Sequence, residues 1–140
     1  MNQCKKLLVF VVFSMIILSG CKKNDTPAVT GYRVVTQVDI TCRHKRTLVT
    51  RHYTDSEKME SVLLYLRLLK PTGKPQTDPD KLDREIFEIT VNFSDGTKKQ
   101  YKQKAHRYIA RENRPWEAID PAQAYGLYAL MQYYPSDPNL

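Results

Sequence analysis

The chain has 140 residues, a formal net charge of +7 and 41% hydrophobic residues. This length supports one domain with a single hydrophobic core and is too short for two. The moderate positive charge permits attraction to an anionic partner, and it carries no information about the fold.

The first 21 residues predict where the protein is located. Lys5 and Lys6 are basic, residues 7–18 are apolar except for Ser14, and the sequence LSGC follows at 18–21. A basic segment, a short apolar segment and small residues at a cleavage site are typical of a secretory signal peptide. An uncleaved transmembrane helix is the alternative, but a span needs about 20 apolar residues and this run is shorter.

The LSGC ending resembles the lipobox of bacterial lipoproteins. In that family the signal peptide is removed before the cysteine, whose sulfur receives a diacylglycerol. The resemblance implies a mature protein that begins at lipidated Cys21, on the exported side of the cell membrane or of an outer membrane. An Asp after the cysteine resembles an inner-membrane retention signal, and Lys22 stands there instead, which favours an outer membrane where the organism has one. Export also argues against nucleic acid as a partner.

The chain after Cys21 divides into a tether and a domain. Residues 22–31 are polar, contain Pro27 and Gly31 and show no periodicity, which is typical of a flexible linker. We therefore predict a signal peptide at 1–20, a lipidated cysteine and tether at 21–31, and a single α+β domain at 32–140.

Two β-hairpins are predicted in the domain. Residues 32–42 alternate between two faces, residues 47–53 are rich in β-branched and aromatic side chains, and the basic sequence RHKR lies between them at 43–46. This pattern predicts a hairpin with a basic tip. Residues 85–93 alternate in the same way, and the sequence SDG at 94–96 predicts the turn of a second hairpin.

The turn of the second hairpin determines which side chains face the core. A two-residue turn places polar side chains opposite Ile89 and Val91, whereas a three-residue turn with Gly96 in the left-handed conformation places Tyr101 opposite Ile89. We predict the second register because it keeps polar groups out of the core. The outer face of the last strand then carries Lys98, Gln100, Lys102 and Lys104.

The first predicted helix follows the first hairpin. Thr54 and Glu57 have the spacing of a capping box, an apolar stripe runs through residues 59–69, and Pro71 ends the helix. The segment 70–84 is rich in proline and polar residues, so we expect a long disordered loop.

The second predicted helix begins with Asp120 as N-cap and Pro121 in its first turn, and it continues to Tyr134 before Pro135. The resulting order is ββαββα. It predicts an α+β domain of two layers, in which an antiparallel four-stranded sheet carries both helices on one face.

Catalytic and metal chemistry have little support in the sequence. Cys42 is the one cysteine left after processing, and its place on an alternating strand predicts a buried free thiol. The histidines at 44, 52 and 106 lack the spacing of a zinc site, and no nucleophile motif is present. We therefore expect neither an enzyme nor a cofactor or metal.

Aromatic residues near the second helix support an alternative function. Trp116, Tyr125 and Tyr128 lie beside Glu117 and Asp120, and acids next to stacking surfaces are found in proteins that bind or process glycans. The same acids also fit an ordinary helix start, where they complement the helix dipole.

Basic residues cluster in both hairpins and give the main functional hypothesis. They predict binding of an anionic envelope component or of an acidic protein, although charge runs are often only solvated faces. An inhibitor or assembly accessory of another envelope protein fits the same pattern. The candidate binding residues are Arg43, Lys45, Arg46, Lys98, Lys102 and Lys104.

Overall fold

A computed structural model describes residues 33–133 of the chain. The predicted signal peptide, Cys21, the tether and the predicted helix end at Tyr134 lie outside the described residues. Among residues 33–133, no helix has the length and apolar character needed to cross a membrane. The elements are β1 (Val35–His44), β2 (Thr47–Tyr53), α2 (Ser56–Leu68), β3 (Pro71–Gly73), the 3-10 helix η1 (Pro79–Lys81), β4 (Ile86–Phe93), β5 (Lys98–Lys104), β6 (Tyr108–Arg111), β7 (Glu117–Ile119), α3 (Pro121–Ala124) and α4 (Gly126–Met131).

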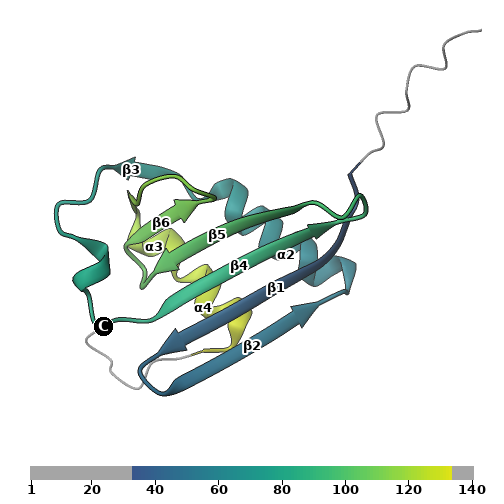
Figure 1. Ribbon diagram of the computed structural model, residues 1–140, viewed down its shortest axis with the longest axis horizontal. Helices are drawn as coiled ribbons and strands as arrows, with labels where there is room; N and C mark the ends of the chain where they lie inside the picture. Colours follow the sequence, from purple (N-terminus) through teal and green to yellow (C-terminus); the bar gives the residue numbers. More distant parts are fainter. Residues whose placement is uncertain (1–32, 134–140) are drawn as a thin grey trace, which may run out of the picture. The chain divides into compact units, whose positions relative to one another are not determined.

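One antiparallel sheet organises the described residues. Its seven strands follow the order β2-β1-β4-β5-β6-β7-β3, and the helices lie together on one of its faces (Figure 1). The predicted four-stranded sheet is therefore wrong. The strands that the sequence pattern does not reveal are β3, β6 and β7, which have only three or four residues each and are too short to show a period of two.

The predicted disorder of segment 70–84 is also wrong. The segment contains β3, which pairs with β7, and the short helix η1. Pro79 is buried, and the hydroxyl groups of Thr77 and Tyr108 are 2.8 Å apart. Contacts with β6 and β7 hold this polar segment in place, and composition alone does not reveal such contacts.

The predicted register of the second hairpin is confirmed. Ile89 pairs with Tyr101 across β4 and β5. The turn between them has three residues, because the amide of Phe93 donates to the carbonyl of Thr97 at 3.0 Å, and Gly96 has a φ of 80°. A glycine adopts this left-handed conformation without the penalty that a Cβ brings.

The helices begin close to their predicted positions. The N-cap of α2 is Asp55 rather than Thr54, since the Asp55 carboxylate accepts from the amide of Lys58 at 3.1 Å. Asp120 caps α3 as predicted and accepts from the amide of Ala122 at 2.9 Å.

The predicted second helix is divided at Tyr125 into α3 and α4. Gly126 starts α4 directly against α2. A Cβ at this position would lie 3.0 Å from the ring of Tyr65, so glycine permits the close approach of the two helices.

The hydrophobic core lies between the sheet and the helices. Phe87 on β4 is fully buried and packs edge-on against Tyr128, with ring centroids 4.9 Å apart. Cys42 is 1% exposed, which confirms the predicted buried thiol. Burial, and then the nearby charge of Glu85, raise the pKa of Cys42 to about 12, so the thiol is protonated and unreactive at neutral pH.

Candidate anion-binding groove

The predicted basic tip of the first hairpin joins β1 to β2. Arg43 and Lys45 are both paired with carboxylates there, at 3.6 Å from Glu88 and 3.8 Å from Asp83. Arg46 is exposed in the turn. Two of the three predicted binding cations at this tip therefore already have an anionic neighbour.

The predicted lysine row on β5 is only partly exposed. Lys98 and Lys102 lie exposed on the outer face of the sheet, whereas Lys104 is only 6% exposed. Lys104 therefore cannot bind a ligand at the surface. Lys104 pairs with Ile86 on one side and with Tyr108 of β6 on the other. The unpredicted strand β6 thus covers the side of β5 that a four-stranded sheet leaves open.

The two predicted groups do not form one surface. Arg43 and Lys104 lie in the same cross-strand row, each paired with Ile86. Lys98 is six residues away along β5, which corresponds to about 20 Å of strand. Carboxylates interrupt the outer face between them, because Glu88 pairs with Lys102 and Asp39 lies on the adjacent strand.

A different set of cations surrounds a groove on the helix side of the sheet, between α2 and the strands β5 and β6. We call it the basic groove. Its volume is about 560 Å³. Its lining residues are Leu63, Leu66, Arg67, Lys99, Tyr101, Arg111, Glu112 and Arg114.

Strand alternation places these cations on the helix side. Lys99 pairs with buried Val91, and Tyr101 pairs with Ile89, so both point toward the helices rather than to the outer face. Arg111 pairs with Tyr101 from β6. Arg67 reaches the same groove from the last turn of α2, where a cation also complements the helix dipole.

Arg111 connects the basic groove to the end of α2. Its Nη2 donates to the carbonyl of Leu69 at 2.9 Å, which ties β6 to the end of α2. Its Nε is buried and has no hydrogen-bond partner among the described residues. Burial raises the pKa of Tyr101 above 10.0 although Arg111 opposes it, so the Tyr101 hydroxyl remains a hydrogen-bond donor at neutral pH.

The electrostatics of the basic groove favour an anion. Four cations line it, and Glu112 is the one carboxylate among its lining residues. Among the ion pairs that residues 33–133 form, none involves any of these four cations. Guanidinium and ammonium groups that form no ion pair are suited to binding phosphate or carboxylate oxygens.

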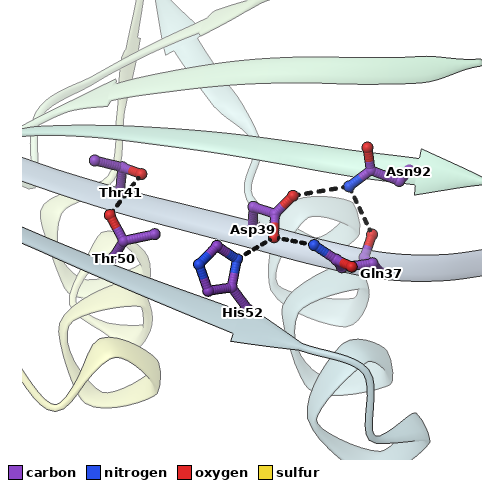
Figure 2. A network of polar contacts seen from close by, with 6 residues as sticks. All are labelled: Gln37, Asp39, Thr41, Thr50, His52 and Asn92. Atoms are coloured by element: carbon purple, nitrogen blue, oxygen red, sulfur yellow. Dashed lines mark hydrogen bonds and ion pairs between the residues drawn. The ribbon is translucent and has the colours of Figure 1, made fainter.

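The outer face of the sheet carries a polar network instead (Figure 2). Asp39 contacts Nδ1 of His52 at 2.7 Å and accepts from Gln37 at 2.6 Å and Asn92 at 2.9 Å. Burial acts to raise the pKa of Asp39, but these three hydrogen bonds outweigh it, and the net pKa is lowered. Asp39 is therefore ionised at neutral pH and orients His52.

Within residues 33–133, no hydrogen bond joins His52 to the neighbouring hydroxyl groups. Those of Thr41 and Thr50 lie 3.2 Å from each other, and within residues 33–133 the hydrogen bond of His52 is to Asp39. An oriented imidazole needs a nucleophile within hydrogen-bond reach to act as its base. We interpret the network as a support of the open sheet face.

The aromatic residues of the glycan alternative do not form an open platform. Tyr128 is 3% exposed and donates a hydrogen bond to the carboxylate of Glu85. Tyr125 is exposed, at 45%, and its ring stacks on His106 with centroids 4.8 Å apart. Trp116 is half-buried. A sugar in solvent therefore cannot stack on Tyr128.

Within residues 33–133, no group of three or more His, Cys, Asp or Glu side chains is placed so that it could hold a metal ion.

The basic groove could be anticipated only in part from the sequence. The alternation of β5 already separates Lys99 and Tyr101 from the outward lysines. The contribution of Arg111 and Arg114 depends on β6, which the sequence pattern does not show.

Comparisons with protein-family models, with curated proteins and with solved structures give no match for this chain.

Proposed function

We propose that the protein is a lipid-anchored, non-enzymatic protein of the bacterial cell envelope that binds an anionic envelope component in the basic groove. The observation that carries this proposal is the set of four groove cations without an ion-pair partner among the described residues. The lipobox resemblance at Cys21 supports the anchor. The proposal moves the binding role from the hairpin tip and the outer lysines to the groove.

The chemistry of the lining residues supports binding rather than a reaction. Arginine and lysine side chains donate several charge-assisted hydrogen bonds to oxyanions, and Tyr101 adds a neutral donor. Leu63 and Leu66 form an apolar wall, which lowers the competition from water for those hydrogen bonds. Such a groove holds an anion without needing a nucleophile or a base.

Removing the groove cations should weaken anion binding more than removing cations elsewhere. The test variant carries Arg67→Gln, Lys99→Gln and Arg114→Gln, and leaves Arg111 in place because it bonds to Leu69. Three exposed cations at about 0.5 kcal/mol each correspond to roughly tenfold weaker binding. The measurement is the salt concentration at which the full-length chain, in detergent, elutes from immobilised polyphosphate.

A matched variant with Arg43→Gln, Lys45→Gln and Arg46→Gln serves as the control, because it loses the same three charges at the hairpin tip. We expect the groove variant to elute at distinctly lower salt than this control. Equal elution of the two variants would mean that only net charge matters, and would contradict a groove site. Circular dichroism of both variants verifies that the fold is intact.

The anchor has a separate expected result. Changing Cys21 to Ser removes the sulfur that the lipobox resemblance assigns to the diacylglycerol. The unprocessed precursor should then accumulate in a bacterial host, whereas the wild-type chain should begin at a lipidated Cys21. Mass spectrometry of the N-terminal peptide measures both. A wild-type peptide that starts at Cys21 without added lipid mass would contradict the anchor.

A further inference from the structure

The chain enters the sheet beside the turn between β4 and β5. The guanidinium of Arg33 lies 2.8 Å from the carboxylate of Asp95 in this turn. The carbonyl of Val34 accepts from the amide of Ser94 at 2.9 Å. The start of β1 and the turn between β4 and β5 therefore share one end of the sheet (Figure 1). Whatever precedes Arg33 is attached at this end.

This end of the sheet is continuous with the basic groove. The Arg33 guanidinium and the Lys99 ammonium each lie 6.0 Å from the ring centroid of Phe93. Lys99 is also a lining residue of the groove. The hairpin tip lies at the other end of β1, about 30 Å away along ten residues of strand.

The tether is short enough to keep the groove near a membrane. Between Cys21 and Arg33 the chain spans at most about 40 Å when fully extended, at ~3.4 Å for each residue. An anchor at Cys21 would confine this end of the domain to a thin layer above the lipid. Confinement of that kind gives the groove a high effective concentration of headgroups.

Exposed leucines beside the groove distinguish a lipid surface from a soluble polyanion. Leu64 is 51% exposed and Leu68 is 57% exposed, and they lie one turn apart on α2, next to Arg67. Apolar side chains beside cations are typical of helices that rest in the interfacial region of a bilayer. The acids Glu57 and Glu60 lie toward the N-terminal end of α2, where they line a hollow together with Leu64 and Arg67, and residues 64–70 contain no acid.

We propose that the basic groove docks onto the phosphate headgroups of anionic phospholipids in the membrane that carries the anchor. The groove cations hold the phosphate oxygens, and Leu64 and Leu68 contact the acyl boundary. The helix side of the sheet then faces the membrane, and the outer face of the sheet points away from it. This inference rests on the proposed function, since it names the anionic component and its location.

Energy transfer from the protein to the membrane surface tests the docking. Trp116 is the single tryptophan of the chain and follows Arg114 of the groove by two residues. The lipidated protein is reconstituted into vesicles that contain a dansyl-labelled lipid headgroup as acceptor. We expect strong transfer in phosphatidylglycerol vesicles and weak transfer in phosphatidylcholine vesicles, because only the first offers excess negative charge.

Matched variants make the test specific. The variant with Arg67→Gln, Lys99→Gln and Arg114→Gln should lose transfer to the phosphatidylcholine level, and the hairpin variant at 43, 45 and 46 should retain it. A Leu64→Ser and Leu68→Ser variant should lower transfer without changing elution from polyphosphate. Equal transfer in the two lipids, or equal transfer for the groove and hairpin variants, would overturn the docking.

Competition separates a lipid headgroup from free phosphate. Inorganic phosphate should reduce transfer no more than sodium chloride at the same ionic strength, because screening acts on both equally. A stronger effect of phosphate would identify a soluble phosphate ligand and overturn the lipid assignment.

The elution experiment tests the proposed function separately from the docking. If the groove variant and the hairpin variant elute from polyphosphate at the same salt concentration, the proposed function itself is refuted. If only the energy transfer fails, the membrane docking alone is refuted.

Discussion

Replacing Arg84 with Met is expected to lower the free energy of unfolding by about 3 to 5 kcal/mol at neutral pH, the cost of removing one partner from a buried ion pair. Glu85 is fully buried, and Arg84 donates to its two oxygens at 3.2 Å from Nε and Nη2. The hydroxyl of Tyr128 donates to the same carboxylate. Met keeps much of the volume of the arginine stem and removes the charge, so the variant isolates the ion pair.

The pH dependence of this loss has a defined sign. Burial acts to raise the pKa of Glu85, but the hydrogen bonds from Arg84 and Tyr128 and the charge of Arg84 outweigh it, and the net pKa lies below 4.5. In the wild type the ionised carboxylate therefore contributes stability above about pH 4.5, and this contribution is lost as the pH falls through the lowered pKa. Without Arg84, burial dominates and raises that pKa, which penalises the charged form at neutral pH.

The stability difference between wild type and Arg84→Met should consequently shrink as the pH falls through the raised pKa of Glu85 in the variant and on toward its lowered pKa in the wild type. Urea unfolding at several pH values measures it. The double variant Arg84→Met with Glu85→Gln should recover much of the loss at pH 7, because no unpaired charge remains in the core. A loss that is independent of pH, and that the second substitution does not relieve, would show that Arg84 acts through packing alone.

Phe87→Ala should lower the free energy of unfolding by about 3 to 5 kcal/mol through the cavity that it leaves. The Phe87 ring has no exposed surface and contacts Tyr128 and Tyr133 edge-on, at centroid distances of 4.9 and 6.1 Å. The exposed Leu68 on α2 provides the control, since Leu68→Ala removes similar apolar atoms from the surface and should change stability by less than about 0.5 kcal/mol.

Denaturant midpoints with an unchanged slope give both values for this pair of variants. Similar losses for Phe87→Ala and Leu68→Ala would mean that β4 does not face the main core. A Phe87→Leu variant should fall between wild type and Phe87→Ala, because a smaller cavity remains.

The long alternating strands, and the register of the second hairpin, could be predicted from the sequence. β1, β2, β4 and β5 lie close to their predicted positions, and the pairing of Ile89 with Tyr101 follows from keeping polar groups out of the core. The buried state of Cys42 follows from the same alternation. In each of these cases, at least seven consecutive residues carry the signal.

The short elements could not be predicted from the sequence, because tertiary contacts define them. The three residues of β3 are exposed and include Pro71, and only their pairing with β7 makes them a strand. The burial of Lys104 and the contribution of Arg111 to the basic groove both depend on β6. The sequence therefore shows an excess of basic residues, but it does not show which of them lie together on the surface.

The strand order has a consequence for the way the chain reaches its native state. β2 and β3 occupy opposite edges of the sheet, and α2 connects them across its full width. β1 pairs with β4, and β3 pairs with β7, so strands from early in the chain pair with strands that follow much later in the sequence. Such non-local pairing slows folding relative to helical proteins and makes it cooperative. A chain that emerges from its N-terminus would therefore lack a complete sheet until β7 has emerged.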